Sequence, residues 1–307
     1  MKKTVKKLTV SALAAALILS STVTASAAIE KSANEDSVTY SQQERAAAPA
    51  LKLPASRSIS SYPSATVKRG TAVMSRDAFM LGDTVYVGLR SFASAIGASV
   101  KYTASTKTSV MTMNGLTLSV TDGCFTVYAN SRPLFSLNGA VLMNNGKMYL
   151  PLEHLSKAVG LRLSVSGRTA TLSGSVAPLM SAERYYREDE VLWLARIIHA
   201  ESRGEPLIGQ IAVGNVVLNR VRSKDYPNTI YGVIFDRKYG VQFSPILDGS
   251  IYNTPCYTCV LAAKICLEGF DLSEGALFFL EPEHSTSSWI PKNRPFLFSI
   301  GAHDFYS

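Results

Sequence analysis

One glutamate, Glu201, lies near the expected C-terminal end of an apolar helix. The apolar run VLWLARII occupies residues 191–198, and apolar side chains stand seven, four and three positions before the glutamate. At this spacing they share one face of a helix with Glu201. Gly204 and Pro206 are expected to end the helix, which places the carboxylate at the negative end of the helix dipole. Burial and the dipole are both expected to raise the pKa of Glu201.

A carboxylic acid that keeps its proton near neutral pH can protonate a glycosidic oxygen. Glu201, in the stretch HAESRGEP (199–206), is therefore a candidate general acid. The alternative is a structural role, in which Glu201 pairs with Arg203 or Arg220 or caps a turn, because ion pairs also perturb pKa values. The residues alone leave both interpretations open.

Other polar and aromatic side chains are candidates for substrate contacts. Asn215 and Asn219 share one face of the helix expected over the second apolar run (207–221), and with Gln210 they either line a sugar groove or hold loop backbone. Trp289, in the polar stretch STSSWIPKN, is expected to be exposed and able to stack on a sugar. The candidate substrate-binding residues are Glu205, Gln210, Asn215, Phe243, Asp248 and Trp289.

Cys256 and Cys259 form a CxxC motif at the start of a helix expected over residues 255–269. The helix dipole at this position can lower the pKa of a thiol. A redox function also requires a thioredoxin-like βαβ setting, which the sequence lacks, and zinc would require a second ligand pair at matching spacing. We therefore expect the cysteines to be small packing residues, with no metal or cofactor bound. The connectivity of any disulfides cannot be deduced from spacing.

The N-terminal segment has the order of a secretory signal peptide. Four lysines and an apolar stretch are followed by Ala25, Ser26 and Ala27, so residues 1–28 are expected to direct export. The apolar stretch is short for a membrane span, and an uncleaved anchor helix is the alternative. Residues 29–68 are rich in Ser, Ala, Pro and Lys without periodicity, and are expected to be a flexible linker.

An internal repeat follows the linker. TVYVGLRSFASAIGASVKY (84–102) and KMYLPLEHLSKAVGLRLSV (147–165) align so that each copy predicts a strand, a short helix closed by glycine, and a second strand. Alternating stretches at 108–120 and 168–174 predict hairpin strands. The region 69–175 is thus a β-rich repeat domain, and it resembles the copper-amine-oxidase N-terminal-like domain. Copper itself is not expected, because the region contains a single histidine, His154, and a single cysteine, Cys124, and therefore no ligand cluster.

The charge of the chain is divided unevenly. Residues 29–180 carry 15 basic and 8 acidic side chains, whereas residues 181–307 carry 12 basic and 15 acidic ones. A basic exported module suits an anionic wall polymer or membrane face, with ordinary solvated lysines as the alternative. Nucleic acid is not an expected partner, because no basic aromatic motif is present. The sequence carries no signal for an oligomeric state.

The stretch 173–189 breaks the strand pattern with small residues, a proline and an acidic cluster, which marks a domain boundary. The domain that follows, residues 184–307, contains the motifs HAESRGEPLIGQIAVGNVVLNRVRS (199–223), YPNTIYGVIF (226–235), QFSPILDG (242–249), GALFFLEP (275–282) and IGAHDFY (300–306). Through these motifs the domain resembles the SleB/CwlJ family of bacterial cell-wall hydrolases, known as spore-cortex-lytic enzymes. Between the expected VIF strand (233–235) and the DG turn, where the family often reads PGAFTAV, this chain has DRKYGVQFSPIL.

The resemblance implies a fold and an activity. The fold would be α+β, with the β-rich repeat module followed by a mainly helical, lysozyme-like lytic transglycosylase domain that contains a small β element. Glu201 matches the family's catalytic acid and base in AExRGEP. The substrate would be peptidoglycan of the spore cortex or the vegetative wall, cut between MurNAc and GlcNAc by a secreted enzyme. The N-terminal domain would bind the wall or act as a spacer.

Counting carboxylates separates two mechanisms. A conventional glycosidase holds two carboxylates about 5 to 10 Å apart, whereas a lytic transglycosylase needs one, because the muramic acid 6-hydroxyl closes onto C1. Glu205 would stack beside Glu201 only if the helix continued past Gly204, and Asp248 is expected in a turn. Single-acid chemistry is favoured, with a two-carboxylate muramidase or glucosaminidase as the alternative.

Two further functions remain as rivals. A zinc amidase would draw its ligands from His199, His284 and His303, but the sequence contains no HExxH or similar spacing. A wall-binding protein without catalysis is the other rival. Loss of activity on replacement of Glu201 alone distinguishes an enzyme from that protein.

Overall fold

The computed structural model describes residues 59–307, except Tyr239, His284 and residues 286–288. The expected signal peptide, and the expected linker up to residue 58, lie outside the described residues. No helix in the described part of the chain is both long and apolar enough to span a membrane.

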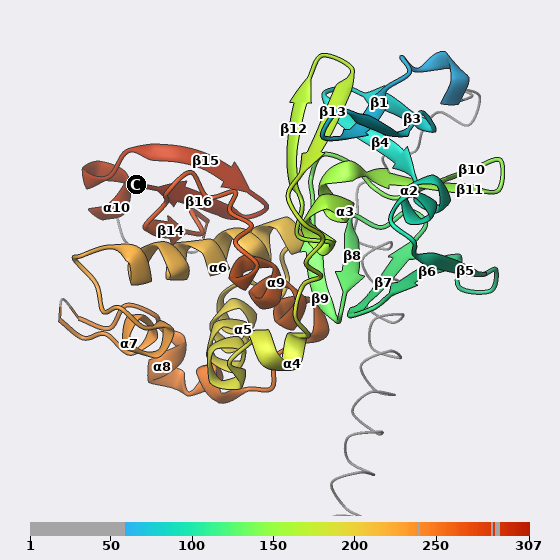
Figure 1. Cartoon of the computed structure of the whole chain (residues 1–307). Helices are drawn as coiled ribbons and strands as arrows, with labels where there is room; N and C mark the ends of the chain where they lie inside the picture. Colours follow the sequence, from blue (N-terminus) through green and yellow to red (C-terminus); the bar gives the residue numbers. More distant parts are fainter. Residues whose placement is uncertain (1–58, 239, 284, 286–288) are drawn as a thin grey trace, which may run out of the picture. The chain divides into compact units, whose positions relative to one another are not determined.

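The region from Ile59 to Ser173 is built from three sheets and two short helices (Figure 1). Two sheets have four strands, in the orders β12-β13-β1-β2 and β10-β11-β4-β3, and the third has five, in the order β5-β6-β7-β8-β9. The elements are η1 (Ile59–Ser61), β1 (Thr66–Arg69), β2 (Ala72–Ser75), β3 (Ala78–Leu81), β4 (Thr84–Gly88), α2 (Leu89–Ala95), β5 (Ser99–Thr103), β6 (Thr108–Met113), β7 (Leu116–Thr121), β8 (Thr126–Ala129), β9 (Arg132–Phe135), β10 (Leu142–Asn144), β11 (Lys147–Pro151), α3 (Leu152–Ala158), β12 (Arg162–Ser166) and β13 (Thr169–Ser173).

The two sequence repeats fold as predicted. The first copy forms β4, α2 and β5, and the second forms β11, α3 and β12. Gly97 and Gly160 follow the two helices with φ of 72° and 69°, a left-handed conformation that glycine adopts without steric cost. The copies meet where β4 and β11 pair antiparallel, with Val87 opposite Leu150. The repeat is therefore also a structural pair.

The N-terminal boundary lies earlier than the sequence suggested. β1 starts at Thr66 and pairs in parallel with β13, with Thr66 opposite Thr169. The last ten residues of the expected linker, 59–68, thus carry η1 and most of β1. β1 has only four residues, which is too few to show a periodic pattern. Its partner strand β13 is about a hundred residues away, so a local pattern contains no sign of the pairing.

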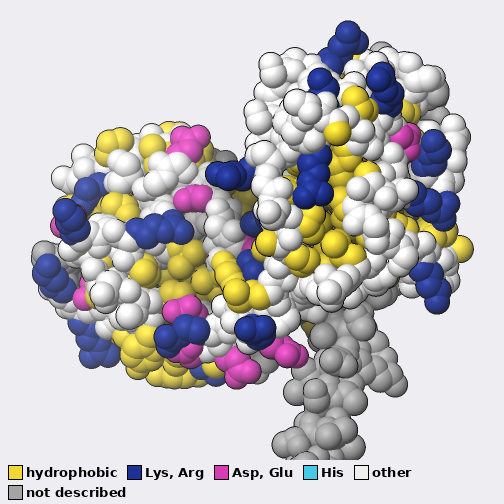
Figure 2. Space-filling view, in the orientation of Figure 1, with side chains coloured by type: hydrophobic (Ala, Val, Ile, Leu, Met, Phe, Trp, Pro, Cys, Tyr) yellow, Lys and Arg dark blue, Asp and Glu magenta, His cyan; other side chains and the backbone are white. Residues whose placement is uncertain are grey.

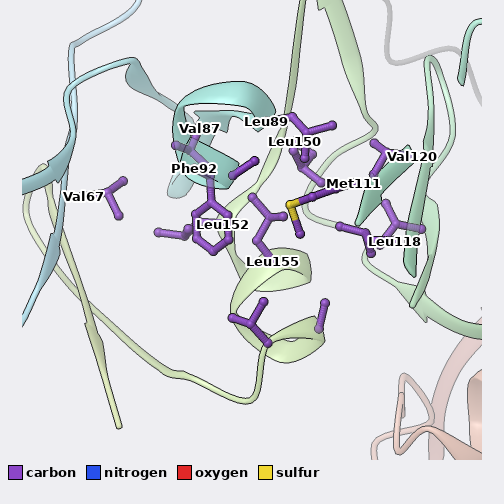
Figure 3. Close-up of a cluster of buried hydrophobic side chains, with 14 of the residues drawn as sticks. Val67, Val87, Leu89, Phe92, Met111, Leu118, Val120, Leu150, Leu152 and Leu155 are labelled. Carbon is purple, nitrogen blue, oxygen red and sulfur yellow. The ribbon is translucent and has the colours of Figure 1, made fainter. Parts of the chain in front are cut away.

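Side chains of both repeat helices fill the core of this region (Figure 3). Phe92 of α2 and Leu155 of α3 are fully buried, together with Met111 of β6 and Leu118 of β7. The alternation along β6 and β7 turns these apolar side chains to one face of their sheet. The hydrophobic effect of this burial is the main force that holds the repeats together.

The region from Ala182 to Tyr306 is mainly helical with one small sheet, as predicted. Helices α5, α6 and α9 pack on one another, and the sheet has the order β14-β16-β15 (Figure 1). The elements are α4 (Ala182–Tyr185), α5 (Glu188–Ser202), α6 (Leu207–Arg222), α7 (Ile230–Ile234), α8 (Pro245–Asp248), η2 (Ser250–Tyr252), α9 (Tyr257–Leu267), β14 (Phe278–Leu280), α10 (Trp289–Asn293), β15 (Phe296–Ile300) and β16 (His303–Tyr306).

Gly214 of α6 allows the three helices to approach closely. A Cβ at this position would lie 2.8 Å from Cys266 Sγ on α9 and 2.9 Å from Ile198 Cδ1 on α5. Ile197, Ile198 and Cys266 are themselves buried. The close packing at Gly214 helps to fix the end of α5 that carries Glu201.

The expected VIF strand is wrong, because residues 230–234 form helix α7. Thr229 caps this helix: its side-chain oxygen accepts a hydrogen bond from Gly232 N–H at 3.0 Å. A capping hydroxyl satisfies an amide that would otherwise lack a partner. The β-branched residues indicated a strand, but this local hydrogen bond and the burial of Val233 and Ile234 favour a helical turn.

A buried ion pair joins Arg132 of β9 to Glu268, which follows α9. Arg132 Nε and Nη2 donate to the two carboxylate oxygens at 2.7 and 2.9 Å, and Tyr186 Oη donates to Glu268 Oε1 at 2.6 Å. Removal of Glu268 would leave the Arg132 charge buried without its carboxylate, which is strongly destabilising, whereas removal of Arg132 would leave Glu268 with Lys157, 3.7 Å away, as its remaining cationic partner. The β-rich and helical regions therefore depend on each other for charge compensation.

Candidate active site

Glu201 is the penultimate residue of α5, and its side chain is partly buried. Burial raises the pKa of its carboxyl from the ordinary value of 4.5 to about 7. The positive charge of Arg220 acts in the opposite direction, and the negative charge of Asp248 raises the pKa further. The raised pKa predicted from the apolar helix face is confirmed. Because the pKa lies near neutrality, the group can both donate and accept a proton.

Arg220 of α6, which the sequence analysis considered only as a structural ion-pair partner of Glu201, acts electrostatically on the Glu201 carboxyl. Its Nε donates to the carbonyl oxygen of Leu277 at 2.7 Å, and it is only 5% exposed. Among the described residues, Nη1 is buried without a hydrogen-bond partner. An arginine within the apolar run 207–221 was the signal available in the sequence, since charged groups are rarely buried without a partner.

Aromatic rings surround the Arg220 guanidinium. Its carbon lies 5.1 Å from the ring centres of Tyr226 and Phe243 and 5.4 Å from that of Phe278. Cation–π contacts of this kind offset part of the cost of burying the charge. Phe243, one of the predicted substrate-binding residues, is 3% exposed and lies beneath this cation.

Asp248 ends α8 and is exposed. Its Oδ1 accepts a hydrogen bond from Ser250 N–H at 2.8 Å, and hydrogen bonds from Ser250 hold the pKa of the carboxyl below its usual range. The turn role expected from the DG sequence is observed, with Gly249 in the left-handed conformation at φ 80°. The pKa values of the two carboxyls are therefore shifted in opposite directions. As a result Asp248 is ionised at neutral pH, and its negative charge helps Glu201 to keep its proton.

The Glu205 carboxylate makes its hydrogen bond to a different segment from those that carry Glu201 and Asp248. The helix ends before it, as predicted, and its Oε2 accepts a hydrogen bond from Ala302 N–H at 3.1 Å in the β15–β16 turn. His303 Nδ1 is 3.9 Å from Oε1. The carboxylate is therefore held by the turn.

Three amide side chains of α6 anchor loops. Gln210 Nε2 donates to the carbonyl of Glu205 at 3.0 Å. The Asn215 amide donates to Phe270 O at 2.8 Å and accepts from Leu272 N–H at 3.2 Å. Asn219 Nδ2 donates to Ser273 Oγ at 2.8 Å and to Ala276 O at 3.0 Å. Of the two roles that the sequence left open, these contacts are those of loop anchors.

The aromatic candidates differ in exposure. Trp289 of α10 is 52% exposed, as the polar context predicted, and its ring meets Phe278 edge-on at 6.2 Å. A second aromatic group, absent from the sequence-based candidates, surrounds Trp193 of α5, the helix that carries Glu201. Its ring contacts those of Tyr231, Phe235 and Tyr252, with centroids 5.2, 5.3 and 6.2 Å away. Exposed rings of this kind can stack on sugars.

The histidines considered for a zinc amidase do not gather at Glu201 in the described part of the chain. His303 packs against Phe279 at 5.5 Å, whereas His199 of α5 lies beside Cys256 and Cys259, with ligand atoms within 4.8 Å of one another. His284 lies outside the described residues. The sequence spacing gave no indication of the group of His199 with the two cysteines, because it arises only when α5 packs on α9.

Each of the two regions is similar to a known protein family. Residues 204–306 match the Cell Wall Hydrolase family. The C-terminal region is thus related to cell wall hydrolases. The match begins three residues after Glu201. Residues 66–173 match the Copper amine oxidase N-terminal domain, so both resemblances inferred from the motifs are confirmed.

Relatives of the cell wall hydrolase region include two spore cortex-lytic enzymes. One from Bacillus cereus is 41% identical over 120 residues, which cover 39% of this chain and 45% of the relative. One from Bacillus subtilis is 38% identical over 120 residues, covering 39% of this chain and 38% of the relative. The chain therefore matches less than half the length of these curated relatives.

One solved structure is also similar in sequence. The catalytic domain of the germination-specific lytic transglycosylase SleB from Bacillus anthracis is 40% identical, covers 40% of this chain and 97% of its own, and superposes with a TM-score of 0.37.

Proposed function

We propose that the cell wall hydrolase region cleaves the glycan strand of peptidoglycan, with Glu201 as general acid and then general base. The observation that carries the proposal is the Glu201 carboxyl itself, partly buried at the end of α5 with a pKa of about 7. The relatives' names, spore cortex-lytic enzyme and lytic transglycosylase, support the substrate and favour spore cortex lysis during germination.

The chemistry requires one group in two roles. Glu201 donates its proton to the glycosidic oxygen as the bond from that oxygen to C1 of the muramic acid breaks. The 6-hydroxyl of the same sugar forms a new bond to C1, and its proton returns to the Glu201 carboxylate. Arg220 supports the first step, because its positive charge lowers the pKa of Glu201 and stabilises the carboxylate that forms when the proton is donated.

Muropeptide analysis tests this mechanism. Digestion of sacculi by the full chain should give 1,6-anhydro-muramic ends without new reducing ends. Glu201→Gln should give neither. Spore cortex and vegetative sacculi are compared in the same assay, and faster release from cortex is the expected result. New free amino groups would indicate an amidase instead.

A two-carboxylate hydrolase is the second candidate, and Asp248 is the observation that favours it. Its exposed carboxylate stays ionised and raises the pKa of Glu201, as the partner of a general acid does. In that mechanism Asp248 holds the attacking water. Reducing ends labelled by borohydride, together with loss of activity in Asp248→Asn, would favour hydrolysis over the transglycosylase reaction.

We propose further that the chain is exported and that the β-rich region binds the wall. Figure 2 shows Lys and Arg side chains over the β-rich region with few Asp or Glu beside them, while acidic side chains gather over the helical region. Exposed basic residues such as Arg162 and Arg168 suit an anionic polymer.

Binding is measured in the inactive Glu201→Gln background so that the wall stays intact. Replacement of Arg162 and Arg168 by serine should weaken co-sedimentation with sacculi at low salt, and salt should weaken it as well. Lys224→Ser, an exposed change in the helical region, serves as the matched control. Equal binding by both variants would indicate that the β-rich region is a spacer.

A further inference from the structure

Cys256 and Cys259 lie at the N-terminus of α9 with their sulfur atoms in contact. Cys256 is the N-cap residue, Cys259 lies in the first turn, and the two Sγ atoms are 2.9 Å apart. This separation is shorter than a van der Waals contact between sulfurs. Amide N–H groups at a helix N-terminus favour a negative charge there, including a thiolate.

The two thiols differ in accessibility and acidity. Cys256 is partly exposed, whereas Cys259 is fully buried. Burial acts to raise the pKa of Cys256, but hydrogen bonds from the Cys259 and Thr258 side chains and from backbone N–H groups outweigh it, so the pKa lies below the ordinary value. Burial, with the neighbouring Cys256, raises the pKa of Cys259. Accessibility and acidity thus make Cys256 the attacking thiol and Cys259 the resolving one.

His199 of α5 completes the cluster. Its Nδ1 accepts a hydrogen bond from Cys256 N–H at 3.1 Å and lies 4.0 Å from Cys259 Sγ. Burial and the charge of Arg203 lower the pKa of His199, so the ring is neutral with an unprotonated Nδ1. The ring thus holds the Cys256 backbone beside Cys259 Sγ.

The geometry favours a covalent bond between the sulfurs over a metal ion. Tetrahedral zinc with bonds of about 2.3 Å to sulfur holds two thiolates roughly 3.8 Å apart, so the sulfurs would have to separate from 2.9 Å. The Nδ1 lone pair that a metal would need is already engaged by Cys256 N–H. A disulfide of about 2.05 Å requires an approach of similar size, so the engaged lone pair is the observation that favours the covalent bond.

We propose that Cys256 and Cys259 form a reactive dithiol that exchanges with low-molecular-weight disulfides, independently of the glycan chemistry at Glu201. The Cys256 thiolate attacks one sulfur of the small disulfide, whose bond breaks and releases one thiolate, which takes up a proton. That proton comes from Cys259, whose sulfur then attacks Cys256 Sγ and displaces the second thiolate, which takes up a proton from water. The protein loses two electrons to the small disulfide, which is reduced to two thiols.

The test uses the full chain in glutathione buffers of varied thiol-to-disulfide ratio. After acid quenching and maleimide alkylation, intact mass and peptide mapping should show Cys256 and Cys259 protected together as a disulfide. The buried Cys266, which donates to Ile211 O, should stay a thiol. Reaction of Cys256 should persist at pH values below the ordinary thiol pKa of about 8.5.

Single variants separate the two roles. Cys259→Ser should accumulate a mixed disulfide with one glutathione at Cys256, whereas Cys256→Ser should react at least about tenfold more slowly. Cys266→Ser is the matched control and should leave the exchange unchanged. Circular dichroism of each variant shows that the fold is retained.

Two results would overturn the proposal. In one, both thiols remain open to alkylation at every glutathione ratio, which would make them packing residues. In the other, the chain binds one zinc ion that protects both thiols and is released by a chelator, with no disulfide formed, which would assign the cluster to a metal.

Discussion

Glu205 and Ala302 are joined by a hydrogen bond that ties the end of α5 to the β15–β16 turn. Glu205 Oε2 accepts from Ala302 N–H at 3.1 Å, and the neighbouring Gly301, with φ of 60°, leaves the space that the carboxylate occupies. A Cβ at Gly301 would collide with the same oxygen. The acidic residue closest to Glu201 in the motif is thus a bridge between two segments almost a hundred residues apart.

Replacement of Glu205 should therefore affect stability more than chemistry. Glu205→Ala leaves the exposed Ala302 amide to water in place of the carboxylate and should lower the free energy of unfolding by about 0.5 to 1.5 kcal/mol. Glu205→Gln keeps an acceptor oxygen and should lose clearly less. Urea unfolding of both variants measures the difference. A stable Glu205→Gln protein as inactive as Glu201→Gln would instead make Glu205 the second carboxylate.

Replacement of Glu201 should abolish cleavage and leave the fold intact. An amide keeps the shape of the side chain but cannot donate or recover a proton, so Glu201→Gln should lower kcat by about 10²-fold or more. Turbidity loss of sacculi and muropeptide release measure the effect. Glu190→Gln, an exposed acidic change on the same helix, is the control and should retain activity.

The activity should fall as the pH rises through about 7. Glu201 must be protonated to act as the acid, so kcat/KM should decrease about tenfold for each pH unit above its pKa of about 7. Asp248→Asn removes a charge that raises this pKa and should move the alkaline limb to lower pH. A limb that does not move in Asp248→Asn would show that another group controls it.

Stability should depend on the same proton. The carboxyl has its pKa raised from 4.5 to about 7 in the folded chain, so its contribution to stability is complete below pH 4.5 and is lost as the pH rises through 7. Glu201→Gln carries no such proton. The free energy of unfolding of Glu201→Gln minus that of the wild type should therefore increase by about 1 to 3 kcal/mol from acidic to mildly alkaline pH. Urea unfolding at pH 4 and pH 8 tests the sign.

Local patterns predicted much of this molecule. The repeat copies, the helix that carries Glu201 and the raised pKa all follow from apolar spacing and turn residues within about twenty positions. The residues Gly204 and Pro206 also predicted that α5 ends before Glu205. These features depend on neighbours in sequence, which a pattern contains.

The features that were missed depend on contacts between distant segments. Arg220 belongs to the site because rings from Tyr226, Phe243 and Phe278 surround it. His199 joins the cysteines only through the packing of α5 on α9. For α7, the tertiary environment overrode a β-branched pattern that favoured a strand. Spacing within one segment contains no information on such partners.

The parallel pairing of β1 with β13 sets the order in which the β-rich region can fold. Thr66 finds its partner only when Thr169 is present, so the sheet stays incomplete until almost the whole region has emerged. Contacts between such distant residues slow folding, because a long loop must close first. A chain that crosses a membrane as an extended polypeptide benefits from this delay. In the export that we propose, the late strand would keep the region unfolded until Thr169 is available to pair with Thr66.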